Sequence, residues 1–199
     1  LRRINIRAQD RVALLLFNSP EFIISYFAVV KIQAVVVPIN HMLKIDEVRF
    51  ILQDSGACAL ITSTEFLDMA KDLKASLETL NTIVIVGERS FAETRNFYEL
   101  IDTGFEEEIK TSTQADDEED VVILYTSGTT GHPRGAILTH KNLISNVRAC
   151  VNAIEAVSED NFVCLLPMFH SFAWTVCVLM SVYVGAGIVV IESLRHFSR

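Results

Sequence analysis

The sequence predicts an α/β protein with mostly parallel β-sheets, and two patterns support this prediction. Short apolar runs rich in Val and Ile recur along the chain, and segments with a helical period of apolar residues separate them. Strands that alternate with helices favour parallel sheets, because each helix returns the chain to the edge where the previous strand began. Half of the 199 residues are hydrophobic, which is enough for a sizeable core.

The first predicted region, residues 1–87, contains four strands with helices between them. The strands are expected at Val12–Phe17, Val35–Val37, Cys58–Ile61 and Ile83–Val86. Ser19 and Pro20 predict the start of the first helix, because a hydroxyl caps a helix and proline suits its first turn. A second helix is expected to end at Gly56, and a third carries apolar residues from Phe66 to Leu80.

Residues 88–120 lose this periodicity and carry the net charge of the chain. Nine acidic residues and one base, Lys110, lie between Asp102 and Asp120, and nine negative charges against one positive charge give the formal −8 of the whole sequence. We interpret this stretch as a solvated connection between two α/β regions. Because no basic stripe occurs elsewhere, nucleic acid is not an expected partner.

The second predicted region, residues 121–199, resumes the alternation of strands and helices. Its strands are expected at Val121–Tyr125, Phe162–Leu166 and Ile188–Ile191. A helix is expected from about His140, with Thr139 as its N-cap. The stretch Trp174–Ile191 has 18 residues without a charge, which is also compatible with a membrane-anchored interaction protein. Gly185 and Gly187 favour a helix followed by a strand.

The cysteines and the N terminus indicate the cellular compartment in which the protein is expected. The four cysteines lie in apolar patterns without a CxxC spacing, so we expect buried thiols in a reducing, cytoplasmic compartment and no metal site. They are Cys58, Cys150, Cys164 and Cys177. No signal peptide is recognised, and a first residue other than Met suggests a start within a longer protein.

A loop rich in glycine and hydroxyl groups follows the strand expected at Val121–Tyr125. It reads Tyr125-Thr126-Ser127-Gly128-Thr129-Thr130-Gly131-His132-Pro133-Arg134-Gly135. Glycines permit tight turns whose N–H groups bind anions, hydroxyls add donors, and Arg134 adds a guanidinium suited to phosphate. We therefore predict a polyphosphate-binding loop. Its spacing differs from that of a Walker P-loop.

This loop resembles the signature phosphate loop of the adenylate-forming (AMP-binding) superfamily, which includes acyl-CoA synthetases, luciferases and peptide-synthetase adenylation domains. The resemblance extends to Asn18–Phe22, Tyr26–Lys31, Val35–Asn40 and Leu165–Phe172. His41 stands where proline is common, and Arg134 stands where lysine is more common. Within the superfamily, the sequence is most similar to bacterial long-chain fatty acyl-CoA ligases.

The resemblance implies a reaction and assigns residues to it. In such enzymes a carboxylate attacks the α-phosphorus of ATP to give an acyl-adenylate and pyrophosphate, and a thiol then displaces AMP. Arg134 is expected to offset developing charge, and His170 to lie near the carboxylate and the α-phosphate. The implied ATP-binding residues are Thr126, Ser127, Gly128, Thr129, Thr130 and Gly131. The aromatic residues Phe169, Phe172 and Trp174 are candidates for lining the acyl pocket, although such residues are more often core.

The resemblance further implies that residues 1–199 are an incomplete N-terminal domain, inactive alone and with apolar surface exposed. The magnesium-binding acid, the ribose-binding aspartate and the C-terminal lid domain with its lysine would lie beyond residue 199. The implied cofactors are ATP, Mg²⁺ and coenzyme A, and the implied partner is a small carboxylic acid. Peripheral membrane contact is compatible with a fatty acid as substrate. Aryl-acid, amino-acid or carrier-protein-linked adenylation and a non-catalytic nucleotide-binding homologue stay open.

Overall fold

The computed structural model describes residues 1–102, 117–126 and 133–192. Within these residues the larger sheet has seven strands in the order β5-β4-β3-β1-β2-β6-β7. They are β1 (Arg11–Leu15), β2 (Val35–Pro38), β3 (Ala59–Ser63), β4 (Thr82–Val86), β5 (Arg95–Asn96), β6 (Asp120–Thr126) and β7 (Arg134–Thr139). Every neighbouring pair is parallel except β6 and β7. The prediction of an α/β protein with a mostly parallel sheet is confirmed.

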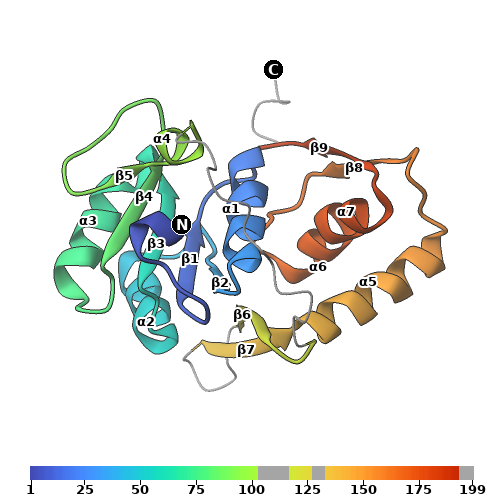
Figure 1. Cartoon of the computed structure of the whole chain (residues 1–199), viewed down its shortest axis with the longest axis horizontal. Helices are drawn as coiled ribbons and strands as arrows, with labels where there is room; N and C mark the ends of the chain where they lie inside the picture. Colours follow the sequence, from blue (N-terminus) through green and yellow to red (C-terminus); the bar gives the residue numbers. More distant parts are fainter. Residues whose placement is uncertain (103–116, 127–132, 193–199) are drawn as a thin grey trace.

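Helices cover both faces of this sheet (Figure 1). Alternate residues of β1 point to opposite faces, so Val12 and Leu14 pack on the side of α1 (Pro20–Lys31), whereas Ala13 and Leu15 pack on the other side. That second side carries α2 (Ile45–Ser55) and α3 (Leu67–Ser76). Two apolar cores therefore lie back to back across the sheet.

The predicted start of the first helix and the predicted end of the second are confirmed. The Ser19 hydroxyl accepts a hydrogen bond of 3.2 Å from the Phe22 N–H, and Pro20 occupies the first position of α1. Gly56 ends α2 with φ at 62°, a left-handed conformation that glycine adopts without steric cost.

A second, two-stranded sheet pairs β8 (Asn161–Cys164) with β9 (Gly187–Val190) in parallel. Between these strands runs one helical segment made of α6 (Ser171–Ala173), the π-helix η3 (Trp174–Leu179) and α7 (Met180–Val184). Figure 1 shows α1 between this unit and the larger sheet, and α5 (His140–Ile154) along its outer side. Side chains of α1, η3 and both sheets join in one core.

The membrane alternative for Trp174–Ile191 is not supported. In the part of the chain that the structure describes, no helix is both long and apolar enough to cross a bilayer. The helical segment ends at Gly185, where φ is 79°, and the remaining apolar residues form β9.

Several elements differ from the sequence-based expectation. The third helix ends at Ser76 and is preceded by the short 3-10 helix η2 (Thr64–Phe66), and another, η1 (Arg2–Ile4), opens the chain. The stretch 88–120 contains β5 and α4 (Phe97–Asp102), which were not predicted, whereas residues 103–116 lie outside the described part. Of the four thiols expected in the core, only that of Cys164 is buried, since the others lie at partly exposed positions.

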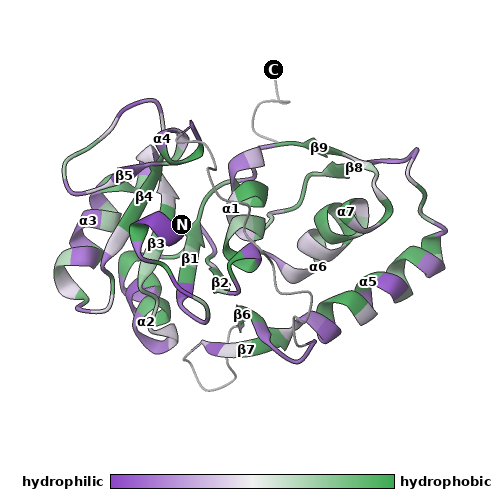
Figure 2. Ribbon diagram, viewed as in Figure 1, coloured by the Kyte–Doolittle hydropathy of each residue, from purple (hydrophilic) through white to green (hydrophobic). Residues whose placement is uncertain are grey.

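Apolar side chains remain exposed mainly on the second region. Figure 2 shows hydrophobic residues through the strands of the larger sheet and a mixture of hydrophobic and hydrophilic residues along α5. Exposed side chains include Ile137, Ile154, Val163, Phe172 and Val182. Among the described residues, the first region thus encloses its core more completely than the second.

Candidate functional site

The predicted phosphate loop connects β6 to β7 in an antiparallel hairpin. Thr126 ends β6, Arg134 begins β7, and these two residues are register partners. Both are exposed, so a hydroxyl and a guanidinium are available at the base of the loop. The helix expected from about His140 is present as α5, but β7, which was not predicted, lies between the loop and this helix. Ser127, Gly128, Thr129, Thr130 and Gly131 lie outside the described residues.

One face of this hairpin joins the base of the loop to an apolar cavity. Because side chains alternate along a strand, Thr126 shares a face of β6 with Leu124 and Val122. Register partners also share a face, so Arg134 and Leu138 lie on that side of β7. A cavity of about 340 Å³ is lined by Val122, Leu124 and Leu138. The phosphate loop therefore begins at one end of the face that closes the cavity.

The opposite face of the hairpin is fixed to the first region. The Tyr125 hydroxyl donates a hydrogen bond of 2.6 Å to the Asp54 carboxylate on α2. Burial, together with this carboxylate, raises the pKa of Tyr125. Gly135 lies across from Tyr125, and a Cβ there would stand 2.8 Å from the Ile123 Cγ2 atom and 3.1 Å from the Tyr125 ring. A side chain at this position would therefore require the Ile123 or Tyr125 side chain to shift.

The structure places His170 at the start of the helical segment that contains α6. Its Nδ1 atom accepts a hydrogen bond of 3.3 Å from the Phe172 N–H, which caps the helix. In a neutral imidazole the proton then resides on Nε2. The side chain is exposed, so Nε2 is a donor available to a ligand. Capping and ligand contact are compatible roles for the two ring nitrogens.

Asn18 fixes the segment that precedes His170, a role that the sequence did not reveal. Its side-chain amide donates hydrogen bonds of 2.9 Å to the Leu166 carbonyl and 3.2 Å to the Ile191 carbonyl. Its Oδ1 atom accepts one of 2.7 Å from the Met168 N–H. Asn18 follows β1, whereas Leu166 and Ile191 follow β8 and β9. One buried side chain thus joins the carboxyl ends of both sheets.

His41 and Phe17 support the same segment from the other side. The His41 ring lies 4.6 Å from the Phe17 ring and 5.5 Å from the Phe169 ring, measured between centroids. Burial lowers the pKa of His41, which favours the uncharged imidazole between these rings. This packing gives His41, which stands where proline is common in the family, a structural role. Phe169 in turn lines the 340 Å³ cavity, as do Ser171 and Trp174.

A second, more open cleft of about 450 Å³ lies at the carboxyl ends of β1, β3 and β4. Its charged lining residues are Glu21, Glu65, Glu88, Glu192 and Arg89. Four carboxylates against one guanidinium disfavour a polyphosphate. The base of the hairpin, with Thr126 and Arg134, suits that ligand better.

Thr139 and Lys141 lie at the junction of β7 and α5. The Thr139 hydroxyl accepts a hydrogen bond from the Asn142 N–H and caps α5 as predicted. Lys141 forms an ion pair with Glu118, and its backbone N–H donates to the Asp117 carbonyl. These contacts give Lys141 a structural role.

Comparison with known proteins identifies the family. The AMP-binding enzyme family matches residues 1–198, nearly the whole chain. The chain belongs to this family. The resemblance inferred from Thr126–Gly135 and the flanking segments is thereby confirmed.

Several relatives of this AMP-binding chain have named activities. It is 34% identical over 179 residues to a long-chain-fatty-acid–CoA ligase of Mycobacterium tuberculosis, covering 89% of this chain and 34% of that protein. It is 34% identical over 199 residues to a crotonobetaine/carnitine–CoA ligase of Salmonella agona, covering 98% and 38%. The chain therefore spans about a third of the length of these relatives.

Solved structures agree with the fold. A crystal structure of an anthranilate CoA ligase with anthranoyl-AMP superposes with a TM-score of 0.89 at 30% identity, covering 96% of the AMP-binding chain and 37% of that protein. An inhibitor-bound N-terminal domain of a Mycobacterium tuberculosis protein, FACL13, gives a TM-score of 0.84 at 30% identity, covering 97% and 46%. The fold expected from the family resemblance is confirmed.

Proposed function

We propose that the protein containing this chain activates a carboxylic acid with ATP and transfers the acyl group to a thiol. The observation that carries this proposal is the register pair of Thr126 and Arg134. Two phosphate-suited donors stand at the base of the glycine-rich loop, on the same face as the residues that close an apolar cavity. The carboxylate of an acid bound in that cavity would reach the phosphates along one face of the hairpin.

The described residues fit a polyphosphate at this position. Arg134 is a permanent cation with fork-like donors, and the Thr126 hydroxyl adds one more donor. The loop residues Ser127, Gly128, Thr129, Thr130 and Gly131 are proposed to hold the β- and γ-phosphates. Preorganised donors of this kind lower the barrier by stabilising charge that develops on the leaving pyrophosphate.

His170 is proposed to orient the carboxylate of the substrate. Its Nδ1 atom is engaged with the Phe172 N–H, so Nε2 is left to donate toward an incoming oxygen. Asn18 and His41 hold the backbone and the Phe169 ring next to it. Accurate placement of the reacting carboxylate is itself a large part of such catalysis.

The apolar cavity supports a fatty acid, in particular a long-chain one, as the substrate. Its side chains are mainly aliphatic and aromatic, from Phe22 and Tyr26 on α1 to Met168 and Leu143. Such a lining favours a hydrocarbon chain over a charged amino-acid side chain. An aryl acid is the second candidate, supported by the structural similarity to an anthranilate CoA ligase.

Magnesium and coenzyme A complete the proposal. In the described ranges, no cluster of three or more His, Cys, Asp or Glu side chains is arranged to hold a metal ion. Mg²⁺ is proposed to bind chiefly through the phosphates of ATP, as it commonly does. Coenzyme A is the proposed thiol, since both curated relatives described above are named as CoA ligases.

The decisive experiment is acid-dependent ATP–pyrophosphate exchange by the full-length gene product. The panel contains fatty acids of several lengths, aryl acids and amino acids, with Mg²⁺ present. Exchange with fatty acids is expected, and subsequent thioester formation with coenzyme A would complete the reaction. Exchange with aryl acids alone would replace the substrate assignment. Tight ATP binding without exchange for any acid would identify a non-catalytic nucleotide-binding homologue.

A further inference from the structure

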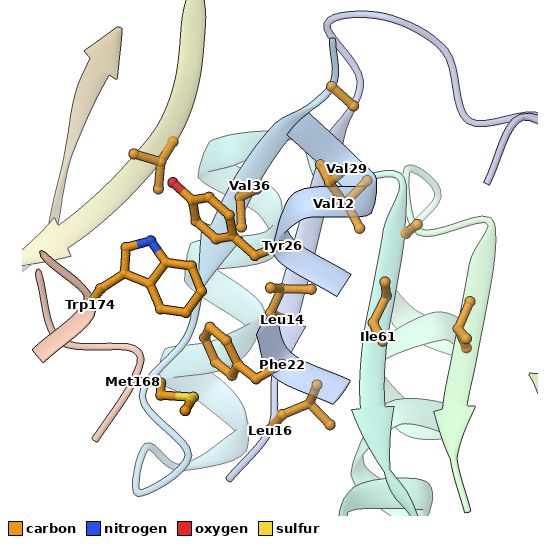
Figure 3. Packing of buried hydrophobic residues seen from close by; sticks show 14 of the residues in the cluster. Val12, Leu14, Leu16, Phe22, Tyr26, Val29, Val36, Ile61, Met168 and Trp174 are labelled. Atoms are coloured by element: carbon orange, nitrogen blue, oxygen red, sulfur yellow. The ribbon is translucent and has the colours of Figure 1, made fainter. Parts of the chain in front are cut away.

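Two side chains that line the 340 Å³ cavity each carry a buried polar atom without a hydrogen-bond partner in the described structure. These atoms are the hydroxyl oxygen of Tyr26 and the Nε1 atom of Trp174. The two side chains are only 2% and 6% exposed, respectively. Their ring centroids lie 4.3 Å apart, and Figure 3 shows both polar ends on the same side of the pair, away from Phe22 and Met168.

The two atoms do not satisfy each other. The indole N–H lies close enough to moderate the pKa of Tyr26, which burial raises, but its geometry falls short of a hydrogen bond. Trp174 has only a donor to offer at this atom. Even if its N–H reached the phenol oxygen, the phenol proton would still need an acceptor. Two donors are therefore directed at a region that lacks an acceptor.

The two side-chain amide oxygens on the cavity wall, those of Asn142 and Asn146, already have donors. The Asn142 Oδ1 atom accepts hydrogen bonds from the N–H and the hydroxyl of Thr139. The Asn146 Oδ1 atom accepts one of 3.3 Å from the Cys150 thiol. Because a buried donor without an acceptor is unfavourable, the occupant of the cavity is the natural source of the missing acceptor.

We propose that the acid activated by this protein carries an oxo group on its chain, and that its carbonyl oxygen accepts hydrogen bonds from Tyr26 and Trp174. This inference rests on the proposed acid-activating function. A ketone oxygen has two lone pairs and no proton, so one atom matches both donors. The remaining lining is mainly aliphatic and aromatic, with Asn, Ser and Thr side chains among it, and its apolar part suits the hydrocarbon on either side of the oxo group. The substrate class is therefore an oxo fatty acid.

The test compares matched acids in ATP–pyrophosphate exchange by the full-length protein. Each saturated fatty acid is paired with oxo acids of equal length, with the carbonyl moved stepwise along the chain. At one carbonyl position, kcat/KM is expected to exceed that of the saturated acid by about tenfold or more, because a site built around donors discriminates against an analogue that lacks the acceptor. The preference should fall at least severalfold in Tyr26→Phe, which keeps the ring.

Tyr183→Phe is the matched control, since that tyrosine is exposed on α7 and does not line the cavity. It should leave the ratio between oxo and saturated acids unchanged. Exchange with saturated acids but no oxo preference would overturn the inference and would indicate that ordered water occupies the position. An oxo preference that survives in Tyr26→Phe would also overturn the assignment.

A binding measurement separates failure of the inference from failure of the proposed function. Calorimetric titration of the full-length protein should show tighter binding of the preferred oxo acid than of the saturated acid, and Tyr26→Phe should reduce this difference. Oxo-selective binding without any pyrophosphate exchange would contradict acid activation and keep the site. Equal binding of both acids would contradict the site.

Discussion

The Met168 N–H donates a hydrogen bond of 2.7 Å to the side chain of Asn18, a residue 150 positions earlier in the chain. The same side chain binds the carbonyls of Leu166 and Ile191. The bonds to Leu166 and Met168 fix the segment that leads to His170, and the third joins it to the residue that follows β9. Buried groups that lose such a partner cost free energy, because no water replaces it.

Asn18→Ala is expected to lower the free energy of unfolding by about 2–3 kcal/mol, since it leaves buried backbone groups unpaired. It should also reduce acid activation, because the segment before His170 loses its support. Urea unfolding and pyrophosphate exchange measure the two effects. Asn152→Ala, at an exposed position on α5, is the control. Equal stability of the two variants would contradict the role given to Asn18.

Arg134→Ala is expected to lower kcat/KM for pyrophosphate exchange by about tenfold or more, which corresponds to about 1.4 kcal/mol of lost transition-state stabilisation. Arg134→Lys should retain more activity, because it keeps the charge while losing the fork of donors. Arg95→Ala is the control, since β5 and β7 form opposite edges of the sheet. Unchanged exchange in Arg134→Ala would remove this residue from the proposed site.

Gly135→Ala is expected to destabilise the hairpin by about 1–3 kcal/mol, as for other overpacked positions. The added methyl would lie 2.8 Å from the Ile123 Cγ2 atom and 3.1 Å from the Tyr125 ring. Thermal unfolding measures the loss. If the variant unfolds at the wild-type temperature, the hairpin accommodates a side chain there and the need for glycine is refuted.

Alkaline pH is expected to weaken the fold through Tyr26 and Tyr125. Burial raises the pKa of both phenols in the folded chain. The unfolded chain therefore ionises first, so this stability is fully present below about pH 10, the ordinary tyrosine pKa, and is lost as the pH rises further. Denaturant unfolding at a series of alkaline pH values should show the fall. Its slope should be smaller in Tyr26→Phe, and an identical slope would contradict the prediction.

Strong local signals explain which elements could be predicted from the sequence. The Ser19-Pro20 start of α1 and the Gly56 end of α2 depend on residues adjacent to each helix end, so a short window contains the whole signal. By contrast, β7 was missed because Arg134-Gly135-Ala136 reads as the end of a flexible loop. Its strand conformation comes from pairing with β6. Asn96 was an overlooked local signal, since its side chain accepts hydrogen bonds from the N–H groups of Tyr98 and Glu99 and starts α4.

The candidate site likewise combines residues that a local sequence pattern predicts with residues whose roles depend on distant contacts. Thr126, Arg134 and His170 are recognisable because their neighbours in the sequence form a pattern. Asn18 stands in a recognised segment, but its bonding role depends on residues that follow β8 and β9. The orphan donors of Tyr26 and Trp174 likewise arise from packing between distant elements, which a linear pattern does not contain.

The long sequence separation between Asn18 and its hydrogen-bond partners also bears on the order in which parts of the chain can fold. Its partners lie 148, 150 and 173 residues further along the chain, whereas β1, β2, β3 and β4 pair within residues 11–86. At ribosomal rates of about 5–20 residues per second, Asn18 precedes Ile191 by on the order of ten seconds or more. The strands β1 to β4 can therefore pair before β8 and β9 are synthesised, and Asn18 can form all three of its hydrogen bonds only after Ile191 has been added to the chain.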